Sequence, residues 1–300
     1  MAAMLLFSGN ANIPLAQNIV TALSTTLGLA TISQYSDGES KIEIHQAVRD
    51  QDIFIIQPTS SPANANILEL CLLANALQTK QARSITAVMP YFGYGRHDGD
   101  LNNGPNSAKL IIELLVTAGI NRILALDVHS QRLQKYSNIT FNNISAAPLF
   151  VNLPQIKQLP DPVIVSPDMG GVKRAREFAK LLGSATVAII DKQRCSGNKT
   201  AATTIIGNVA NRNCIIVDDI IDTGNTIYTA AAALKAQGTQ QVYVCCTHAV
   251  LSDNGLQHIQ NSVCDKIFVT DSIHSTHNLT TVSKLHYVSV AALLAASIVS

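Results

Sequence analysis

The sequence predicts an α/β fold made of two similar, doubly wound domains, each built on a mainly parallel sheet. Short apolar runs typical of buried strands alternate with longer stretches of helical spacing. This alternation occurs twice, and a segment rich in Asn and Pro, residues 138–161, separates the two halves. The chain has 300 residues, enough for two domains of about 150 residues each. We place the boundary near Ala147, which gives domains of residues 1–147 and 148–300.

In the first half, apolar runs predict strands at residues 5–8, 52–57, 84–89 and 122–127. Apolar residues at helical spacing predict helices at 15–27, 66–77 and 109–118. Pro14 stands near the start of the first of these helices, and Gly28 is expected to end it, because these residue types favour those positions.

The second half repeats the pattern. Apolar runs predict strands at 163–166, 186–191, 214–218 and 241–247, and helical spacing predicts helices at 172–182, 226–237 and 253–262. The last segment, 289–300, has a weak helical pattern, and the helix it predicts can pack on the N-terminal domain. In sheets of this kind, ligands bind at the carboxyl ends of the strands, so the residues that follow each strand are the candidate site.

Composition excludes several classes of protein. Hydrophobic residues make up 47% of the chain, charged residues only 14%, and the formal net charge is +1. The chain is therefore too apolar for intrinsic disorder and lacks the positive charge of a non-specific nucleic-acid binder. The longest uncharged apolar stretch, residues 287–299, is shorter than the roughly 20 residues of a membrane span. The first residues lack the basic start of a signal peptide, and we expect no membrane association and a cytoplasmic protein.

The six cysteines show no C-x-x-C spacing. Three of them, Cys214, Cys245 and Cys246, lie in apolar runs that predict strands. Buried, reduced thiols are the interpretation that this pattern favours, and a zinc or redox site is the alternative.

The sharpest motif is residues 214–226, CIIVDDIIDTGNT. A predicted strand ends in Asp218 and Asp219, and a Thr-Gly-Asn-Thr turn then opens an Ala-rich helix. The free N–H groups of a helix N-terminus suit a phosphate monoester, and Gly224 permits its close approach. Adjacent carboxylates can accept hydrogen bonds from the vicinal hydroxyls of a sugar. A capped helix alone does not explain the acid pair.

This motif resembles the ribose-5-phosphate loop of type I phosphoribosyltransferases and of ribose-phosphate pyrophosphokinases, the PRPP synthetases. Their second glycine is Asn225 here, and Asn is the residue other than Gly that best tolerates a left-handed backbone. The ribose-5-phosphate-binding residues implied by the resemblance are Arg194, Asp218, Asp219, Asp222, Thr223, Gly224, Asn225 and Thr226.

Further segments resemble the PRPP synthetases, in order and over about residues 5–290. They are YSDGE at 35–39, MPYFGYGRHD at 89–98, DVH at 127–129, SPDMGG at 166–171 and DKQR at 191–194. The ATP-binding residues that the resemblance implies are Tyr35, Asp37, Gly38, Glu39, Arg96 and His97. It implies His129 and Asp168 as Mg²⁺ ligands, and Lys192 and Arg194 as catalytic residues.

The resemblance thus implies two phosphoribosyltransferase-like domains and a diphosphotransferase of nucleotide biosynthesis. The diphosphoryl group of ATP would move to the C1 hydroxyl of ribose 5-phosphate, giving 5-phosphoribosyl 1-diphosphate (PRPP) and AMP. In the family, dimers assemble into hexamers, so a homo-oligomer is expected. Taken singly, each motif also has an ordinary explanation as a turn, a surface histidine or a solvated basic loop.

Two departures from the family pattern leave alternatives open. The family's basic loop after Asp98 is here residues 99–108, which contain no basic residue and one acid, Asp100, and Gln193 replaces an arginine. A non-catalytic or regulatory paralogue that binds nucleotide and ribose phosphate is therefore one alternative, and a simple phosphoribosyltransferase is another. Because an anion site needs cations or N–H donors, we also expect a weak response to inorganic phosphate.

Overall fold

The computed structural model describes residues 4–98, 106–136, 138–192, 203–275 and 282–300. The chain divides into two compact units, each with its own sheet and hydrophobic core. Unit 1 comprises Met1–Ser145, Ser272–His274 and Ser289–Ser300, and unit 2 comprises Ala146–Asp271 and Ser275–Val288.

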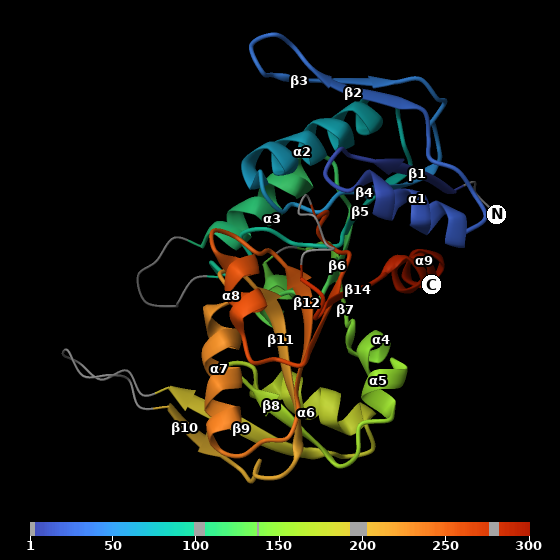
Figure 1. Ribbon diagram of the computed structural model, residues 1–300. Helices are drawn as coiled ribbons and strands as arrows, with labels where there is room; N and C mark the ends of the chain where they lie inside the picture. Colours follow the sequence, from blue (N-terminus) through green and yellow to red (C-terminus); the bar gives the residue numbers. More distant parts are fainter. Residues whose placement is uncertain (1–3, 99–105, 137, 193–202, 276–281) are drawn as a thin grey trace. The chain divides into compact units, whose positions relative to one another are not determined.

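Unit 1 contains a parallel sheet in the order β1-β4-β5-β6-β7. Its strands are β1 (Met4–Ser8), β4 (Asp52–Ile56), β5 (Ser84–Met89), β6 (Arg122–Leu126) and β7 (Thr140–Ile144). Helices α2 (Ala63–Thr79) and α3 (Ser107–Thr117) cover one face, and α1 (Ile13–Ala22) and α9 (Ala291–Val299) the other (Figure 1). A short 3₁₀ helix, Gln131–Lys135, follows β6. Because both faces are covered, β1, β4, β5 and β6 consist of nearly continuous apolar runs, whereas the edge strand β7 is largely polar.

A separate antiparallel hairpin in unit 1 consists of β2 (Ala30–Gln34) and β3 (Ser40–Ile44). The hairpin extends beyond the sheet near α2, and the residues of the YSDGE segment form its turn (Figure 1). Its strands mix polar and apolar residues and are partly exposed, so they lack the long apolar runs on which our strand predictions relied.

Unit 2 contains a larger sheet in the order β10-β9-β8-β11-β12-β13-β14, parallel except for β10. Its strands are β8 (Pro162–Ser166), β9 (Thr186–Lys192), β10 (Thr203–Ile206), β11 (Asn213–Ile221), β12 (Val242–Ala249), β13 (Lys266–Thr270) and β14 (Leu285–Val288). Helices α7 (Asn225–Ala236) and α8 (Gly255–Asn261) pack on one face, and α4 (Ala147–Val151), α5 (Pro154–Lys157) and α6 (Val172–Leu181) lie on the other (Figure 1).

These sheets confirm the predicted α/β fold with mainly parallel strands. The predicted strands are all present, but β11 continues for three residues beyond Asp218. The strands of the hairpin and the strands β7, β10, β13 and β14 were not predicted from the sequence.

The first helix is shorter than predicted, because it ends at Ala22 rather than near residue 27. Ser24 has a left-handed backbone (φ 53°), and the N–H of Thr25 donates to the carbonyl of Val20 at 2.9 Å. Residues 24–26 are Ser, Thr and Thr, which favour helix ends over helix interiors. Gly28 therefore does not end a helix. A Cβ atom there would lie 2.6 Å from the Phe7 ring, so glycine is needed for close packing on β1.

The described cysteines are free thiols, as expected, and Cys195 lies outside the described residues. Burial raises the pKa of Cys214, Cys245, Cys246 and Cys264, which keeps these thiols neutral. None of the helices in the described ranges is both long enough and apolar enough to span a bilayer.

Candidate functional site

Three of the predicted site segments in unit 2 lie near the carboxyl ends of strands. Asp168 follows β8, the acid pair Asp218–Asp219 lies in the neighbouring strand β11, and residues 222–226 join β11 to α7. The carboxyl ends of parallel strands are where such sheets bind ligands. From the sequence, the strand was expected to end at the acid pair. In the structure the acid pair lies inside β11, because pairing with β12 continues to Ile221.

The acid pair is buried and is joined to a cation. The side chains of Asp218 and Asp219 are 14% and 3% exposed. Arg174 Nη1 lies 3.1 Å from Asp218 Oδ1, and Nη2 lies 3.1 Å from Asp219 Oδ1. Sequence reasoning missed Arg174. The available signal was an arginine in the first turn of the helix that follows the Gly-Gly segment.

Burial, reinforced by the neighbouring Asp219 carboxylate, raises the pKa of Asp218 to about 8, although Arg174 opposes the shift. The folded protein therefore binds this proton more tightly than the unfolded chain does, so its free energy of unfolding falls as the pH rises from the unfolded pKa toward the folded one.

We accordingly expect Asp218→Asn to weaken the pH dependence of stability. Between pH 6 and 9, thermal unfolding of the variant should shift less than that of the wild type, because the titrating carboxyl is gone. Asp253→Asn, at an exposed aspartate, is the control and should keep the wild-type slope. Parallel curves for Asp218→Asn and the wild type would contradict the raised pKa.

The loop from Asp222 to Thr226 forms the N-terminus of α7. Gly224 is the N-cap, with a left-handed backbone (φ 75°) and no side-chain capping bond. The first N–H groups of the helix are therefore not capped by the residue that precedes them, as an anion site requires. Asn225 is not among the residues with positive φ; it begins the helix. Asn225 therefore does not need a left-handed backbone to replace the family's second glycine, and the explanation predicted from the sequence is wrong on this point.

Three residues that sequence reasoning missed hold this loop from α8 and the turn before it. Ser252 Oγ donates a hydrogen bond to Asp222 Oδ1, and His258 Nδ1 lies 2.7 Å from the carbonyl oxygen of Thr223. A Cβ atom on Gly255 would lie 2.5 Å from the carbonyl oxygen of Asp222. The loop backbone thus rests directly on the first residue of α8.

We therefore expect Gly255→Ala to displace the loop and to raise the KM for a phosphorylated sugar. Overpacking of this kind typically destabilises by about 1–3 kcal/mol, and no flexible side chain can move aside here. Steady-state kinetics and thermal unfolding measure the two effects. Gln257→Ala, exposed on the same helix, should change neither. An unchanged KM for Gly255→Ala would show that the loop does not need this contact.

In unit 1, the segment 35–39 that the resemblance assigns to ATP binding forms the turn of the β2–β3 hairpin. The N–H of Tyr35 donates to the carbonyl of Glu39 at 2.8 Å, and Gly38 has φ 91°. Asp37 Oδ1 accepts the N–H of Glu39 at 3.1 Å. The Tyr35 side chain is 53% exposed, so its ring is available to stack on a base.

Arg96, His97 and His129 follow the neighbouring strands β5 and β6 of unit 1 and are exposed. The His97 ring meets the Tyr94 ring edge-on at 6.4 Å between centroids. His129 follows Asp127, whose backbone is left-handed (φ 35°), and Val128, whose N–H donates to Asn143 Oδ1 at 2.9 Å. These candidate ATP and metal residues therefore lie beyond the carboxyl ends of two neighbouring central strands of unit 1.

The remaining predicted residues are only partly covered. Lys192 is the last residue of β9, beside β8, and Arg194 lies outside the described residues, as does the neutral loop at 99–105. In the described ranges, no cluster of three or more His, Cys, Asp or Glu side chains is suited to a metal ion. Asp168 is exposed, and its Oδ1 accepts the N–H of Gly171 at 2.9 Å. A single protein ligand, such as the His129 imidazole in unit 1 or the Asp168 carboxylate in unit 2, suits a cation held largely by substrate phosphates and water.

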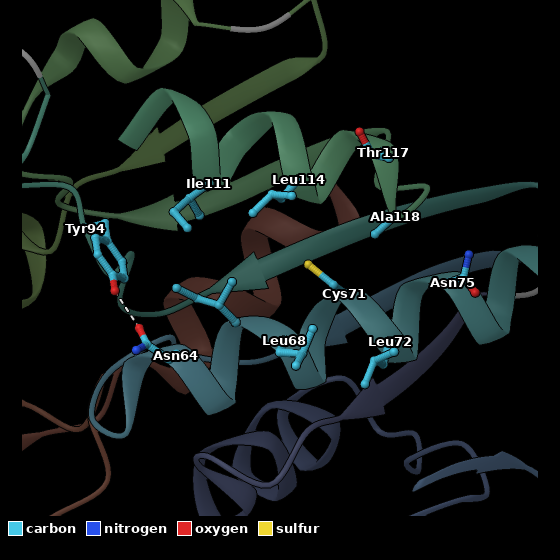
Figure 2. A pocket seen from close by; sticks show the side chains of 11 residues that line it. Asn64, Leu68, Cys71, Leu72, Asn75, Tyr94, Ile111, Leu114, Thr117 and Ala118 are labelled. Carbon is cyan, nitrogen blue, oxygen red and sulfur yellow. Dashed lines mark hydrogen bonds between the residues drawn. The ribbon is translucent and has the colours of Figure 1, made fainter. Parts of the chain in front are cut away.

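A cavity of about 460 Å³ between α2 and α3 is a different feature (Figure 2). Its lining is apolar apart from amide and hydroxyl groups, and it includes Leu68, Cys71, Leu72 and Leu114. It contains no charged side chain, so it does not suit a nucleotide.

Comparisons with known proteins cover nearly the whole chain. Residues 4–119 match the model of the N-terminal domain of ribose phosphate pyrophosphokinase, and residues 194–300 match that of the phosphoribosyl synthetase-associated domain. The ribose-phosphate pyrophosphokinase of Vibrio cholerae serotype O1 is 42% identical over 300 residues, which cover 99% of this chain and 96% of the relative. That of Shewanella oneidensis is 41% identical over 295 residues, covering 98% and 94%.

A solved structure agrees with these matches. The crystal structure of phosphoribosylpyrophosphate synthetase from Mycobacterium smegmatis superposes with a TM-score of 0.92 at 31% identity. The alignment covers 98% of this chain and 97% of that one. Together with the two mainly parallel sheets, the acid pair and the glycine loop at the start of α7, these matches show that the chain belongs to the ribose-phosphate pyrophosphokinase family.

Proposed function

We propose that this protein makes PRPP and AMP from ATP and ribose 5-phosphate. The observation that carries the proposal is local to unit 2: within nine residues of the chain, from Asp218 to Thr226, stand a buried acid pair and an uncapped helix N-terminus. Vicinal hydroxyls suit the first, and a phosphate monoester suits the second. Ribose 5-phosphate carries both groups on one small molecule.

The residues take their roles from this arrangement. Asp218 and Asp219 hydrogen-bond to the 2- and 3-hydroxyls of ribose, and residues 222–226 hold the 5-phosphate. In unit 1, the hairpin turn 35–39 with Arg96 and His97 binds ATP. Lys192 and Arg194 neutralise charge on the transferring group, Lys192 as a point charge and Arg194 as a planar fork.

The reaction is an in-line displacement at the β-phosphorus of ATP. The C1 hydroxyl oxygen forms a bond to the β-phosphorus. The bond between the β-phosphorus and the oxygen that joins it to the α-phosphate breaks, AMP leaves with that oxygen, and the hydroxyl proton passes to solvent. Such transfers depend on positioning and charge neutralisation more than on covalent chemistry. His129 in unit 1 would hold an ATP-side Mg²⁺ and Asp168 in unit 2 a ribose-side one, and each ion would offset the charge of the phosphates when it is bound.

The test is a coupled assay for AMP formed from ATP, in the presence of Mg²⁺, with and without ribose 5-phosphate. We expect AMP formation that depends on the sugar phosphate, with PRPP formed in equal amount. ATP and ribose 5-phosphate that bind without AMP appearing would support the non-catalytic paralogue, which the loop without basic residues at 99–108 favours. Formation of PRPP only from a nucleotide and diphosphate would indicate a simple phosphoribosyltransferase.

We also propose that the chain forms a homo-oligomer built from dimers. Its support is an exposed apolar surface on α2 and α3, beside the cavity of Figure 2, where Leu68, Leu110 and Leu114 are 56%, 55% and 45% exposed. Monomeric proteins seldom expose such clusters. Analytical ultracentrifugation decides the matter: a dimer or a multiple of it supports the proposal, and a monomer at micromolar concentration overturns it.

A further inference from the structure

Arg174 links two carboxylates that a regular strand would separate. Consecutive side chains of a strand point to opposite faces of the sheet. Asp218 and Asp219 are consecutive in β11, yet each has its Oδ1 atom 3.1 Å from a nitrogen of the same guanidinium. The register with β12 is the same on both sides of Asp219, with Asp218 paired to Cys246 and Ile220 to His248. The N–H of Asp219 donates to Asp218 Oδ1 at 2.9 Å, which links the two residues directly.

The position of Arg174 is itself well defined. It lies in the first turn of α6, and its side chain is 26% exposed. A Cβ atom on Gly171 would lie 3.6 Å from Arg174 Nη1 and 3.7 Å from Asp168 Oδ1, so the guanidinium and Asp168 border the same glycine. A planar guanidinium bound at two nitrogens sets the orientation of its partners, which a single point charge does not.

We infer that Arg174 is a positioning residue for the sugar site: it holds the Oδ1 atoms of Asp218 and Asp219 and so fixes the orientation in which the acid pair hydrogen-bonds to the two ribose hydroxyls. This inference rests on the proposed function. It assigns a specificity role, because a site built to pair with a hydroxyl discriminates strongly against an analogue that lacks it.

A merely structural Arg174 makes different predictions. If the arginine only neutralised a buried acid pair, its loss would lower stability and leave the preference for ribose over deoxyribose intact. If it positions the pair, its loss weakens binding of ribose 5-phosphate more than binding of 2-deoxyribose 5-phosphate. The ratio of the two affinities therefore separates the two roles.

The experiment compares Arg174→Gln, Arg174→Lys and the control Arg176→Gln, an exposed arginine on the same helix. KM for ribose 5-phosphate and for ATP, and the inhibition constant of 2-deoxyribose 5-phosphate, are measured for each. We expect Arg174→Gln to raise the KM for ribose 5-phosphate about tenfold or more, the size of one lost hydrogen bond to a charged group. The KM for ATP should not change, and discrimination against the deoxy analogue should fall. Arg174→Lys should be intermediate, and Arg176→Gln should match the wild type.

Equal changes in both KM values, or discrimination that survives in Arg174→Gln, would overturn the inference. If that variant does not fold, the same comparison with Arg174→Lys decides, because lysine keeps the charge and loses only the two-point contact. Calorimetric titration with each sugar phosphate keeps the test independent of turnover. A wild-type protein that binds the sugar phosphate without forming AMP would refute the proposed reaction alone, and the affinity ratio would still judge Arg174.

Discussion

Lys192→Ala should lower kcat for PRPP formation by about a hundredfold or more while ATP still binds. The expectation follows from the proposed role: one preorganised charge beside a phosphoryl group in its transition state contributes about 2.7–4 kcal/mol. Lys192 ends β9 in unit 2, and its backbone is paired with Thr203 of β10. This strand pairing fixes the backbone position of Lys192.

Steady-state kinetics and nucleotide binding by calorimetry together measure this effect. The control is Lys180→Ala, at an exposed lysine near the end of α6, which should leave kcat and KM unchanged. If Lys192→Ala keeps most of its activity, the lysine does not act on the transferring group. If ATP binding is lost as well, the residue belongs to ground-state nucleotide binding.

Asp219→Asn should raise the KM for ribose 5-phosphate about tenfold to a hundredfold and leave the KM for ATP nearly unchanged. Hydrogen bonds to charged groups contribute about 1.5–3 kcal/mol, and about 1.4 kcal/mol corresponds to a factor of ten. Asparagine preserves the volume of this 3% exposed side chain but removes the charge that pairs with Arg174. The variant is therefore expected to bind ribose 5-phosphate less tightly, with little change in its binding of ATP.

Kinetics at varied ribose 5-phosphate and at varied ATP test this prediction. Asp265→Asn is the control, because Asp265 pairs with Lys235 and accepts the N–H of Val242, at the beginning rather than the end of β12. It should leave both KM values as they are. An equal rise of both KM values in Asp219→Asn would place the acid pair on a group that both substrates need, such as a metal ion.

Local patterns in the sequence predicted much of the fold. Buried parallel strands are continuous apolar runs, so strands such as β5, from Ser84 to Met89, were predicted with their observed limits. The hairpin of β2 and β3 and the edge strands β7, β10 and β14 were missed, because short or half-exposed strands lack such runs. β13 was also missed, although it is a buried apolar run of the kind that predicts a strand. Helix α1 was predicted too long, because spacing alone does not register the helix-ending preference of Ser and Thr.

The candidate site divides in the same way. The acid pair, Gly224 and the helix start that follows are neighbours in the chain, so the sequence by itself determined that they form one strand–loop–helix unit and suggested its chemistry. Only the tertiary structure brought Arg174 to Asp218, 44 residues away, and set Gly255 against the carbonyl of Asp222. The physical reason is that periodicity and motif spacing record what adjacent residues do. An ion pair or a close backbone contact between distant segments is decided by how the helices pack on the sheet.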